Sequence, residues 1–191
     1  MKIIGLSGKI GTGKSYVAGI LSDLGFRRWG FAWPLKHLVM EKYGFTYEEV
    51  FVTKPEKVRA ALQREGVHAR ETYGDDHWIQ QTAAWLEIMA REWSNRPVVI
   101  DDVRFPNEAD WIRAAGGHIV RLEPGNRPRP ELSEAARTHI SETALDYYND
   151  FDCIIVNDLR TDKAAIVDRL ITSGVLPESY LPVVVNPRCT R

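Results

Sequence analysis

Eight residues near the start of the chain, Gly8-Lys9-Ile10-Gly11-Thr12-Gly13-Lys14-Ser15, have the types and spacing of a phosphate-binding loop. Glycines let the backbone curl so that successive N–H groups point at an anion. A helix that follows adds its positive N-terminal end. Lys14 supplies a point charge for the β- and γ-phosphates, and the Ser15 hydroxyl can bind Mg²⁺. The pattern therefore predicts that a nucleotide phosphate is bound by Gly8, Gly11, Thr12, Gly13, Lys14 and Ser15.

A second group of chemically capable residues follows the apolar run that begins at Pro97. Asp101 and Asp102 end this run, so a strand there places carboxylates at the carboxyl edge of the sheet, where ligands bind in open α/β folds. Beside a phosphate-binding loop, such a carboxylate supports Mg²⁺ directly or through water. We therefore predict a metal site made of Ser15 with Asp101 or Asp102.

Arg104 and Glu108 lie four residues apart around a proline that suits the start of a helix. One interpretation is a surface ion pair at helical spacing. The other places Arg104 in a cleft against a phosphate, with Glu108 orienting the guanidinium. The sequence leaves both open.

The elements around the loop are those that a phosphate-binding loop requires. Residues 3–6 form an apolar run typical of a strand, and residues 16–24 have apolar residues at helical spacing before Gly25. A strand, a glycine loop and a helix in this order favour phosphate binding over a glycine-rich turn with an incidental lysine.

Composition limits the class of protein. The chain has 191 residues, 44% hydrophobic and 27% charged, which is enough for one full core. Its net charge of −1 argues against an extended nucleic-acid groove. Cys153 and Cys189 offer neither a disulfide framework nor metal-ligand spacing. Without a secretory signal or a membrane-spanning run, we expect a cytoplasmic protein whose partners include no nucleic acid polymer and no membrane.

Strand and helix patterns alternate along the chain, which predicts an α/β fold with a parallel sheet. The expected strands are residues 3–6, 26–31, 97–101, 118–122 and 152–157. The expected helices outside the middle of the chain are residues 16–24, 34–43, 107–115 and 162–173. Residues 46–94 contain no convincing strand and predict three helices, near 47–51, 56–64 and 76–93. Residues 123–138 are rich in proline and arginine and predict a loop or lid, and residues 176–191 predict a strap across the surface.

The segment Asp-Val-Arg-Phe-Pro-Asn-Glu-Ala at residues 102–109 resembles the deoxynucleoside monophosphate kinases of bacteriophages. Further segments are similar to that family's motifs and occur in the family's order, over residues 3 to 157. They are Phe31-Ala32-Trp33-Pro34-Leu35-Lys36, Leu62-Gln63-Arg64-Glu65-Gly66, Arg70, Asp76-His77-Trp78, Gly116-Gly117 and His139-Ile140-Ser141-Glu142. The resemblance implies a P-loop kinase of three layers, α/β/α, with a parallel five-stranded sheet. It implies one domain over residues 1–191, with a helical acceptor-binding insert at about 46–94 and a lid at about 123–140.

The resemblance also implies an activity and its residues. The reaction would be Mg²⁺-dependent transfer of the γ-phosphoryl group of ATP onto a small-molecule deoxynucleoside monophosphate, supplying phage DNA synthesis in the host cytoplasm. A homodimer is left open. The residues that the resemblance and the motifs assign to catalysis are Lys14, Asp102, Arg104 and Glu108. Those assigned to the acceptor are Trp33, Arg59, Arg70, Trp78 and Arg104, and those of the lid are Arg127, Arg129 and Arg137.

This chain departs from the family pattern at two positions near the acceptor. Trp33 stands where the family has aspartate, and Val67 stands where threonine commonly follows Gly66. The missing carboxylate removes a hydrogen-bond acceptor for the sugar or base. We expect Trp33 or Trp78 to stack on the acceptor base, the alternative being that both are core residues.

Two other functions are compatible with the loop. A kinase resembling dephospho-coenzyme A kinase would phosphorylate a hydroxyl and so would need a carboxylate base near the acceptor, which Trp33 in place of aspartate disfavours. A non-enzymatic nucleotide-dependent switch would need no acceptor pocket. Guanine-specific switches carry an Asn-Lys-x-Asp motif, which this sequence lacks.

Overall fold

The computed structural model describes residues 1–92, 96–126, 133–158 and 162–180. Five parallel strands form one sheet in the order β2-β3-β1-β4-β5. Their bounds are β1 Ile3–Ser7, β2 Arg27–Trp29, β3 Val98–Val103, β4 His118–Glu123 and β5 Cys153–Val156. The order confirms the predicted parallel five-stranded sheet, and it brings the carboxyl ends of β1 and β3 side by side.

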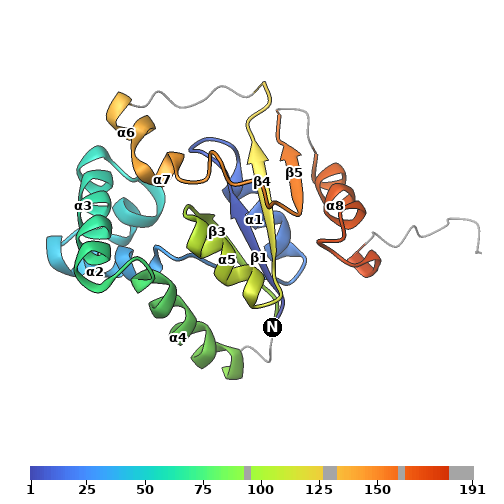
Figure 1. The fold of residues 1–191 in the computed structure, drawn as a ribbon, viewed down its shortest axis with the longest axis horizontal. Coiled ribbons are helices and arrows are strands. Elements are labelled where there is room, and N and C mark those ends of the chain that lie inside the picture. Colours follow the sequence, from blue (N-terminus) through green and yellow to red (C-terminus); the bar gives the residue numbers. More distant parts are fainter. Residues whose placement is uncertain (93–95, 127–132, 159–161, 181–191) are drawn as a thin grey trace, which may run out of the picture.

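Helices cover both faces of the sheet, so the fold has three layers (Figure 1). On one face, α1 (Lys14–Asp23) and α8 (Lys163–Thr172) pack on β1, β4 and β5 through a cluster that includes Leu21 and Leu170. On the other face, α5 (Pro106–Ala114) packs through Ile112 in a second cluster, which also takes Ile79 and Leu86. Strands buried on both faces read as continuous apolar runs, which is why β1 and the first half of β3 were recognisable in the sequence.

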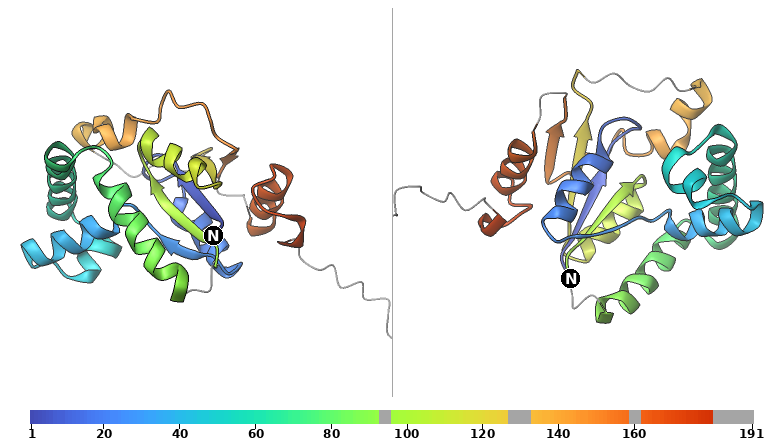
Figure 2. Two further views of the ribbon diagram at one scale, coloured as in Figure 1. Left: turned by 60° about the horizontal axis from the view of Figure 1, so that its bottom comes forward. Right: turned by 180° about the vertical axis from the view of Figure 1, so that it is seen from behind.

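The middle of the chain forms a helical lobe beside the sheet (Figure 2). It contains α2 (Trp33–Tyr43), a π-helical turn at Glu48–Thr53, α3 (Glu56–Tyr73) and α4 (His77–Glu92). The three helices expected between residues 46 and 94 are confirmed, although α3 continues well past Arg64. The helix runs through Gly66, where α2 packs closely: a Cβ at Gly66 would lie 3.2 Å from Leu35 Cδ2.

The chain after β4 differs from the expected loop. Residues Glu134–Thr138 form a short helix, α6, and Ile140–Thr143 form another, α7. The prediction of a loop through residue 138 is therefore wrong for its last turn, and residues 127–132 lie outside the described residues. Of the expected C-terminal strap, the structure describes a 3₁₀ turn at Glu178–Tyr180, and residues 181–191 lie outside it. Within the described ranges, no helix is long and apolar enough to cross a membrane.

The pairing of β1 with β3 shifts register near the end of both strands. Gly5 pairs with Ile100, but Ser7 pairs with Val103, so β3 has one more residue in this interval than β1. Such a bulge re-aims side chains at the end of a strand. Here it falls on Asp101 and Asp102, whose carboxylates consequently have different surroundings.

Candidate functional site

The glycine loop connects the end of β1 to α1 and is held closed by its own contacts. Its glycines have positive φ angles, 146° at Gly8, 84° at Gly11 and 93° at Gly13. A Cβ at Gly8 would lie 2.7 Å from the carbonyl oxygen of Leu122, so no other residue fits that position. The Thr12 hydroxyl donates to the Lys9 carbonyl at 2.9 Å. Thr12 is therefore a structural member of the loop, with its side chain turned inward.

The loop leaves a row of backbone donors open. Within the described ranges, no acceptor bonds the N–H groups of Gly11, Gly13, Lys14 and Ser15. These groups lie at and just before the N-terminus of α1, where the helix dipole also favours negative charge. Unsatisfied donors at a helix start are the fixed part of an anion site, so the residues present fit a nucleotide phosphate.

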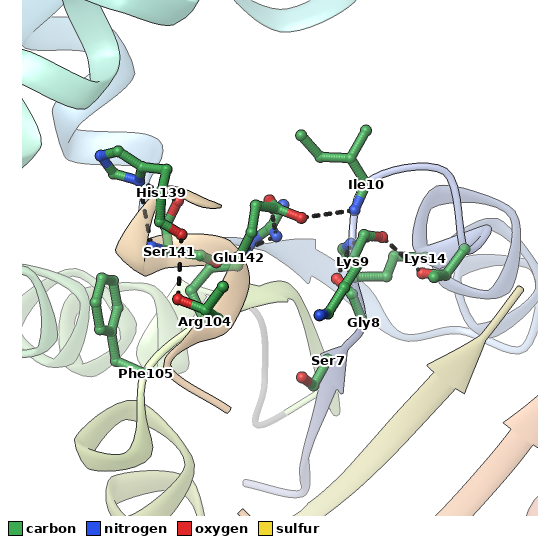
Figure 3. Close-up of polar contacts among 12 residues, drawn as sticks. Ser7, Gly8, Lys9, Ile10, Lys14, Arg104, Phe105, His139, Ser141 and Glu142 are labelled. Carbon is green, nitrogen blue, oxygen red and sulfur yellow. Dashed lines mark hydrogen bonds and ion pairs between the residues drawn. The ribbon is translucent and has the colours of Figure 1, made fainter. Parts of the chain in front are cut away.

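Lys14 folds back over the loop. Its Nζ donates to the carbonyl of Gly8 and to that of Lys9, the latter at 3.0 Å (Figure 3). Burial and, after it, the nearby positive charge of Arg104 lower the pKa of Lys14 to about 7. An arriving phosphate would offer this amine the negative partner that the loop carbonyls do not supply.

Ser15 and Asp101 both contact one arginine, Arg28. Arg28 on β2 donates through Nε to Asp101 Oδ2 at 2.7 Å, and its Nη2 lies 3.2 Å from Ser15 Oγ. A hydroxyl and a carboxylate are the hard oxygen ligands that Mg²⁺ prefers. The donor set thus fits the predicted metal, with Arg28 as the positive group now between the two oxygens. No feature of the sequence singled out Arg28.

Asp102 is used differently from Asp101. Its carboxylate accepts the backbone N–H of Phe31 at 2.7 Å and that of Ala32 at 3.1 Å. It therefore fixes the chain where β2 leads into α2. Burial and then the charge of Asp101 raise the pKa of Asp102. Of the two aspartates predicted for the metal, the contacts favour Asp101.

The side chains of Arg104 and Glu108 do not pair with each other, so the interpretation as a surface ion pair is wrong. Glu108 Oε2 accepts the backbone N–H of Arg104 at 2.7 Å and that of Phe105 at 3.1 Å, while Oε1 pairs with Arg70 at 2.8 Å. Burial raises the pKa of Glu108 to about 7. Glu108 is thus a cap for the start of α5 that also holds Arg70. The guanidinium of Arg70 lies 3.8 Å from the centre of the Phe105 ring.

The side chain of Arg104 instead meets α7. It forms an ion pair with Glu142, and the other carboxylate oxygen of Glu142 accepts the backbone N–H of Ile10 at 2.8 Å (Figure 3). The fold therefore brings Arg104 beside the phosphate-binding loop, but its guanidinium is held by Glu142 and not, as the second interpretation had it, by Glu108. Glu142 was not among the predicted site residues, although the similar His-x-Ser-Glu segment contained the signal.

The residues predicted for the acceptor lie in two environments. Trp78 is 5% exposed in the core of the helical lobe, where its Nε1 donates to the Gly66 carbonyl at 3.4 Å. Trp33 is half-buried, with its ring 4.6 Å from that of Trp29 and edge-on to Phe51 at 5.7 Å. Arg59 donates to the Lys54 carbonyl at 2.8 Å. The geometry favours the core alternative for Trp78 and leaves Trp33 with an accessible edge.

A hollow of about 700 Å³ lies between the helical lobe and the start of α7. It is lined by Lys42, Tyr43, Gln63, Arg64, Glu65, Val67, His68, Glu71 and His139. None of the predicted acceptor residues lines it, although Gln63 belongs to a segment similar to the family's. Of the three predicted lid arginines, Arg137 lies exposed on α6, and Arg127 and Arg129 lie outside the described residues.

No protein-family model matches the chain. The chain is 31% identical over 178 residues to a protein of Acanthamoeba polyphaga mimivirus described as "Putative deoxynucleotide monophosphate kinase", a match that covers 83% of this chain and 89% of the relative.

Three solved structures are similar in fold. The shikimate kinase of Aquifex aeolicus has 13% identity and a TM-score of 0.47, covering 90% of this chain and 95% of its own. The dephospho-CoA kinase of Campylobacter jejuni has 15% identity and a TM-score of 0.45, covering 90% and 94%. A sugar kinase of Janibacter has 16% identity and a TM-score of 0.49, covering 95% and 99%.

Proposed function

The chain belongs to the kinase family of the mimivirus protein, and from that premise we propose that it transfers the γ-phosphoryl group of ATP to a deoxynucleoside monophosphate. The observation that carries the proposal is the meeting of two positive side chains, Lys14 and Arg104, at a loop where four N–H donors have no acceptor among the described residues. The loop accounts for the binding of one substrate phosphate. A second anionic group would account for Arg104, which follows β3 and lies beside the loop.

The donor phosphates are bound by the N–H groups of Gly11, Gly13, Lys14 and Ser15 and by the Lys14 amine. Ser15 and Asp101 would hold Mg²⁺, which supplies further neutralisation of charge on the phosphate oxygens. Phosphoryl transfer needs mainly in-line positioning and positive charge around the transferring group. Lys14 and Arg104 provide that charge beside the loop.

The acceptor is proposed to bind on the side of the helical lobe, within residues 46–94, under a lid at residues 123–140. Arg70 reaches this side with its guanidinium held by Glu108 and Phe105, a rigid arrangement that suits an arginine for binding a phosphate. An acceptor phosphate is already ionised near neutral pH, since its second pKa is about 6. No general base is therefore required.

An assay of ADP release across potential acceptors tests the proposal. The wild-type protein is incubated with ATP, Mg²⁺ and each of the four deoxynucleoside monophosphates, the ribonucleotides and dephospho-coenzyme A. We expect turnover with at least one deoxynucleotide, and loss of that turnover in a folded Lys14→Ala variant.

Two results would reject the proposed acceptor. Turnover with dephospho-coenzyme A alone would assign a hydroxyl-phosphorylating kinase. ATP binding without turnover on any of these acceptors would favour a nucleotide-dependent switch. A deoxynucleotide kinase of this family would supply precursors for DNA synthesis, and we propose that role in a phage-infected cell.

A further inference from the structure

Glu142 contacts both the loop and the arginine that serve the proposed reaction, yet it is neither a phosphate ligand nor a metal ligand. We propose that Glu142 is a positioning residue, which sets the guanidinium of Arg104 against the phosphate-binding loop. The inference rests on the proposed phosphoryl transfer and names a residue that acts through Arg104.

Both oxygens of the Glu142 carboxylate are committed. Oε1 pairs with Arg104 Nη1, and Oε2 accepts the Ile10 N–H at 2.8 Å. The Glu142 side chain is only 6% exposed, against 23% for that of Arg104. A buried carboxylate bonded to a backbone donor and to a guanidinium is in a charge-assisted arrangement with little freedom. One rigid group therefore joins α7, the end of β3 and the loop.

The local structure of α7 holds Glu142 in place. His139 caps this short helix: its Nδ1 accepts the Ser141 N–H at 3.2 Å and lies 2.9 Å from the Ser141 hydroxyl. Three residues after Glu142, Leu145 is 4% exposed in the core cluster beside β3 and α5. The carbonyl of Ser141 lies 3.4 Å from Arg104 Nη1 (Figure 3). The segment is thus anchored at both ends, with Arg104 clamped between a carboxylate and a carbonyl.

The carboxylate stands at the edge of the anion site without filling it. It takes the N–H of Ile10, whereas the four donors from Gly11 to Ser15 remain open in the described structure. A negative group that competed for the phosphate would be expected to take those inner donors. Glu142 instead uses the outermost one, and it holds Arg104 close enough to Lys14 for the positive charge of Arg104 to lower the pKa of that amine.

A double-mutant cycle on kcat tests this inference. The variants are Glu142→Ala, Arg104→Ala and the double substitution, each assayed at saturating ATP and acceptor. Because Glu142 acts through Arg104, we expect Glu142→Ala to lower kcat about 10- to 100-fold and to add less than about threefold in the Arg104→Ala background. Glu142→Gln keeps an acceptor for Ile10 but loses the charge that orients Arg104, and we expect an intermediate loss.

Asp152 offers a matched control. Its carboxylate also joins a backbone N–H, that of Ile119 at 2.7 Å, to an arginine, Arg113 at 3.4 Å, but at the opposite end of β4 from the loop. We expect Asp152→Asn to leave kcat unchanged. A comparable loss of kcat in both variants would show a general structural effect and would overturn the inference.

A second readout does not depend on the acceptor. In ¹⁵N NMR, the Nε–H of Arg104 should give an ordered signal in the wild type that collapses toward that of free arginine in Glu142→Ala. If no deoxynucleotide is turned over by the wild type, the proposed function fails and this signal alone decides the inference. Additive losses in the cycle, tighter ATP binding by Glu142→Ala, or an unchanged Arg104 signal would each overturn it.

Discussion

Binding of the donor nucleotide should take up a proton, because Lys14 has an unusual pKa in the free protein. Burial lowers the pKa of Lys14 to about 7, and its only bonds in the described structure are to the loop carbonyls of Gly8 and Lys9. A phosphate beside the amine favours its charged form and restores the pKa toward its ordinary value. The proton is drawn from the buffer.

The size of the uptake follows from the pKa. At pH 8 a group of pKa 7 is about 9% protonated, so binding should take up about 0.9 proton. At pH 6 the same group is already about 90% protonated, and the uptake should fall to about 0.1. A lysine with an ordinary pKa of about 10.4 would take up less than about 0.01 proton at pH 8. Above pH 7, ATP affinity should fall by about tenfold per pH unit.

Isothermal titration calorimetry measures this uptake. ATP is titrated into the protein at pH 8 in two buffers of different ionisation enthalpy, and the difference in heat gives the protons taken up. Lys14→Arg is the control because arginine remains protonated, so the variant reports any contribution from the nucleotide itself. Uptake below about 0.2 proton in the wild type, or equal uptake in Lys14→Arg, would refute this account of the loop.

Four further substitutions test other parts of the site and its surroundings. Arg104→Lys should lower kcat about tenfold or more, because lysine cannot reproduce the planar contacts of a guanidinium, and unchanged kinetics would point to a surface role. Trp78→Ala should lower the free energy of unfolding by about 3–5 kcal/mol, whereas Trp33→Ala should raise the acceptor KM about 5- to 150-fold; urea unfolding and steady-state kinetics on both separate core from stacking. Glu108 has a pKa of about 7 when folded, above the 4.5 of the unfolded chain, so the folded state holds its proton longer and wild-type stability should fall as the pH rises from about 5 to 7. Glu108→Gln should remove up to roughly 3 kcal/mol of that pH dependence, and urea unfolding at pH 5 and pH 8 that shows the same dependence in both proteins would contradict the assignment.

The sequence by itself determined the phosphate-binding loop and the alternation of strands and helices. Both depend on local spacing: the glycines with positive φ lie within one short loop, and a strand buried on both faces, such as β1, reads as an apolar run. The helical character of residues 46–94 was visible for the same reason. The end of α3 was missed because glycine disfavours a helix interior, whereas Gly66 lies inside α3 where α2 packs closely, a contact that no local pattern records.

Only the tertiary structure decided which partner each charged side chain takes. Asp101 and Asp102 are neighbours in sequence, but a bulge sends one toward Ser15 and Arg28 and the other to the backbone before α2. Glu108 takes Arg70 although Arg104 is four residues away. Helical spacing could not predict the partner of Arg104, because Arg104 precedes α5 and is not part of that helix.

The most distant of these contacts is that of Glu142 with Ile10, across 132 positions of the chain. The sequence showed that residues 139–142 are similar to a motif of the family. The contact of Glu142 with Ile10, however, requires α7 to pack over the carboxyl ends of β1 and β3. Pairing of charges depends on distance in space and on exclusion of water, and both are set by how the elements pack. The phosphate-binding character of the loop is therefore determined by the local sequence, whereas the orientation of the groups around it is determined by the fold.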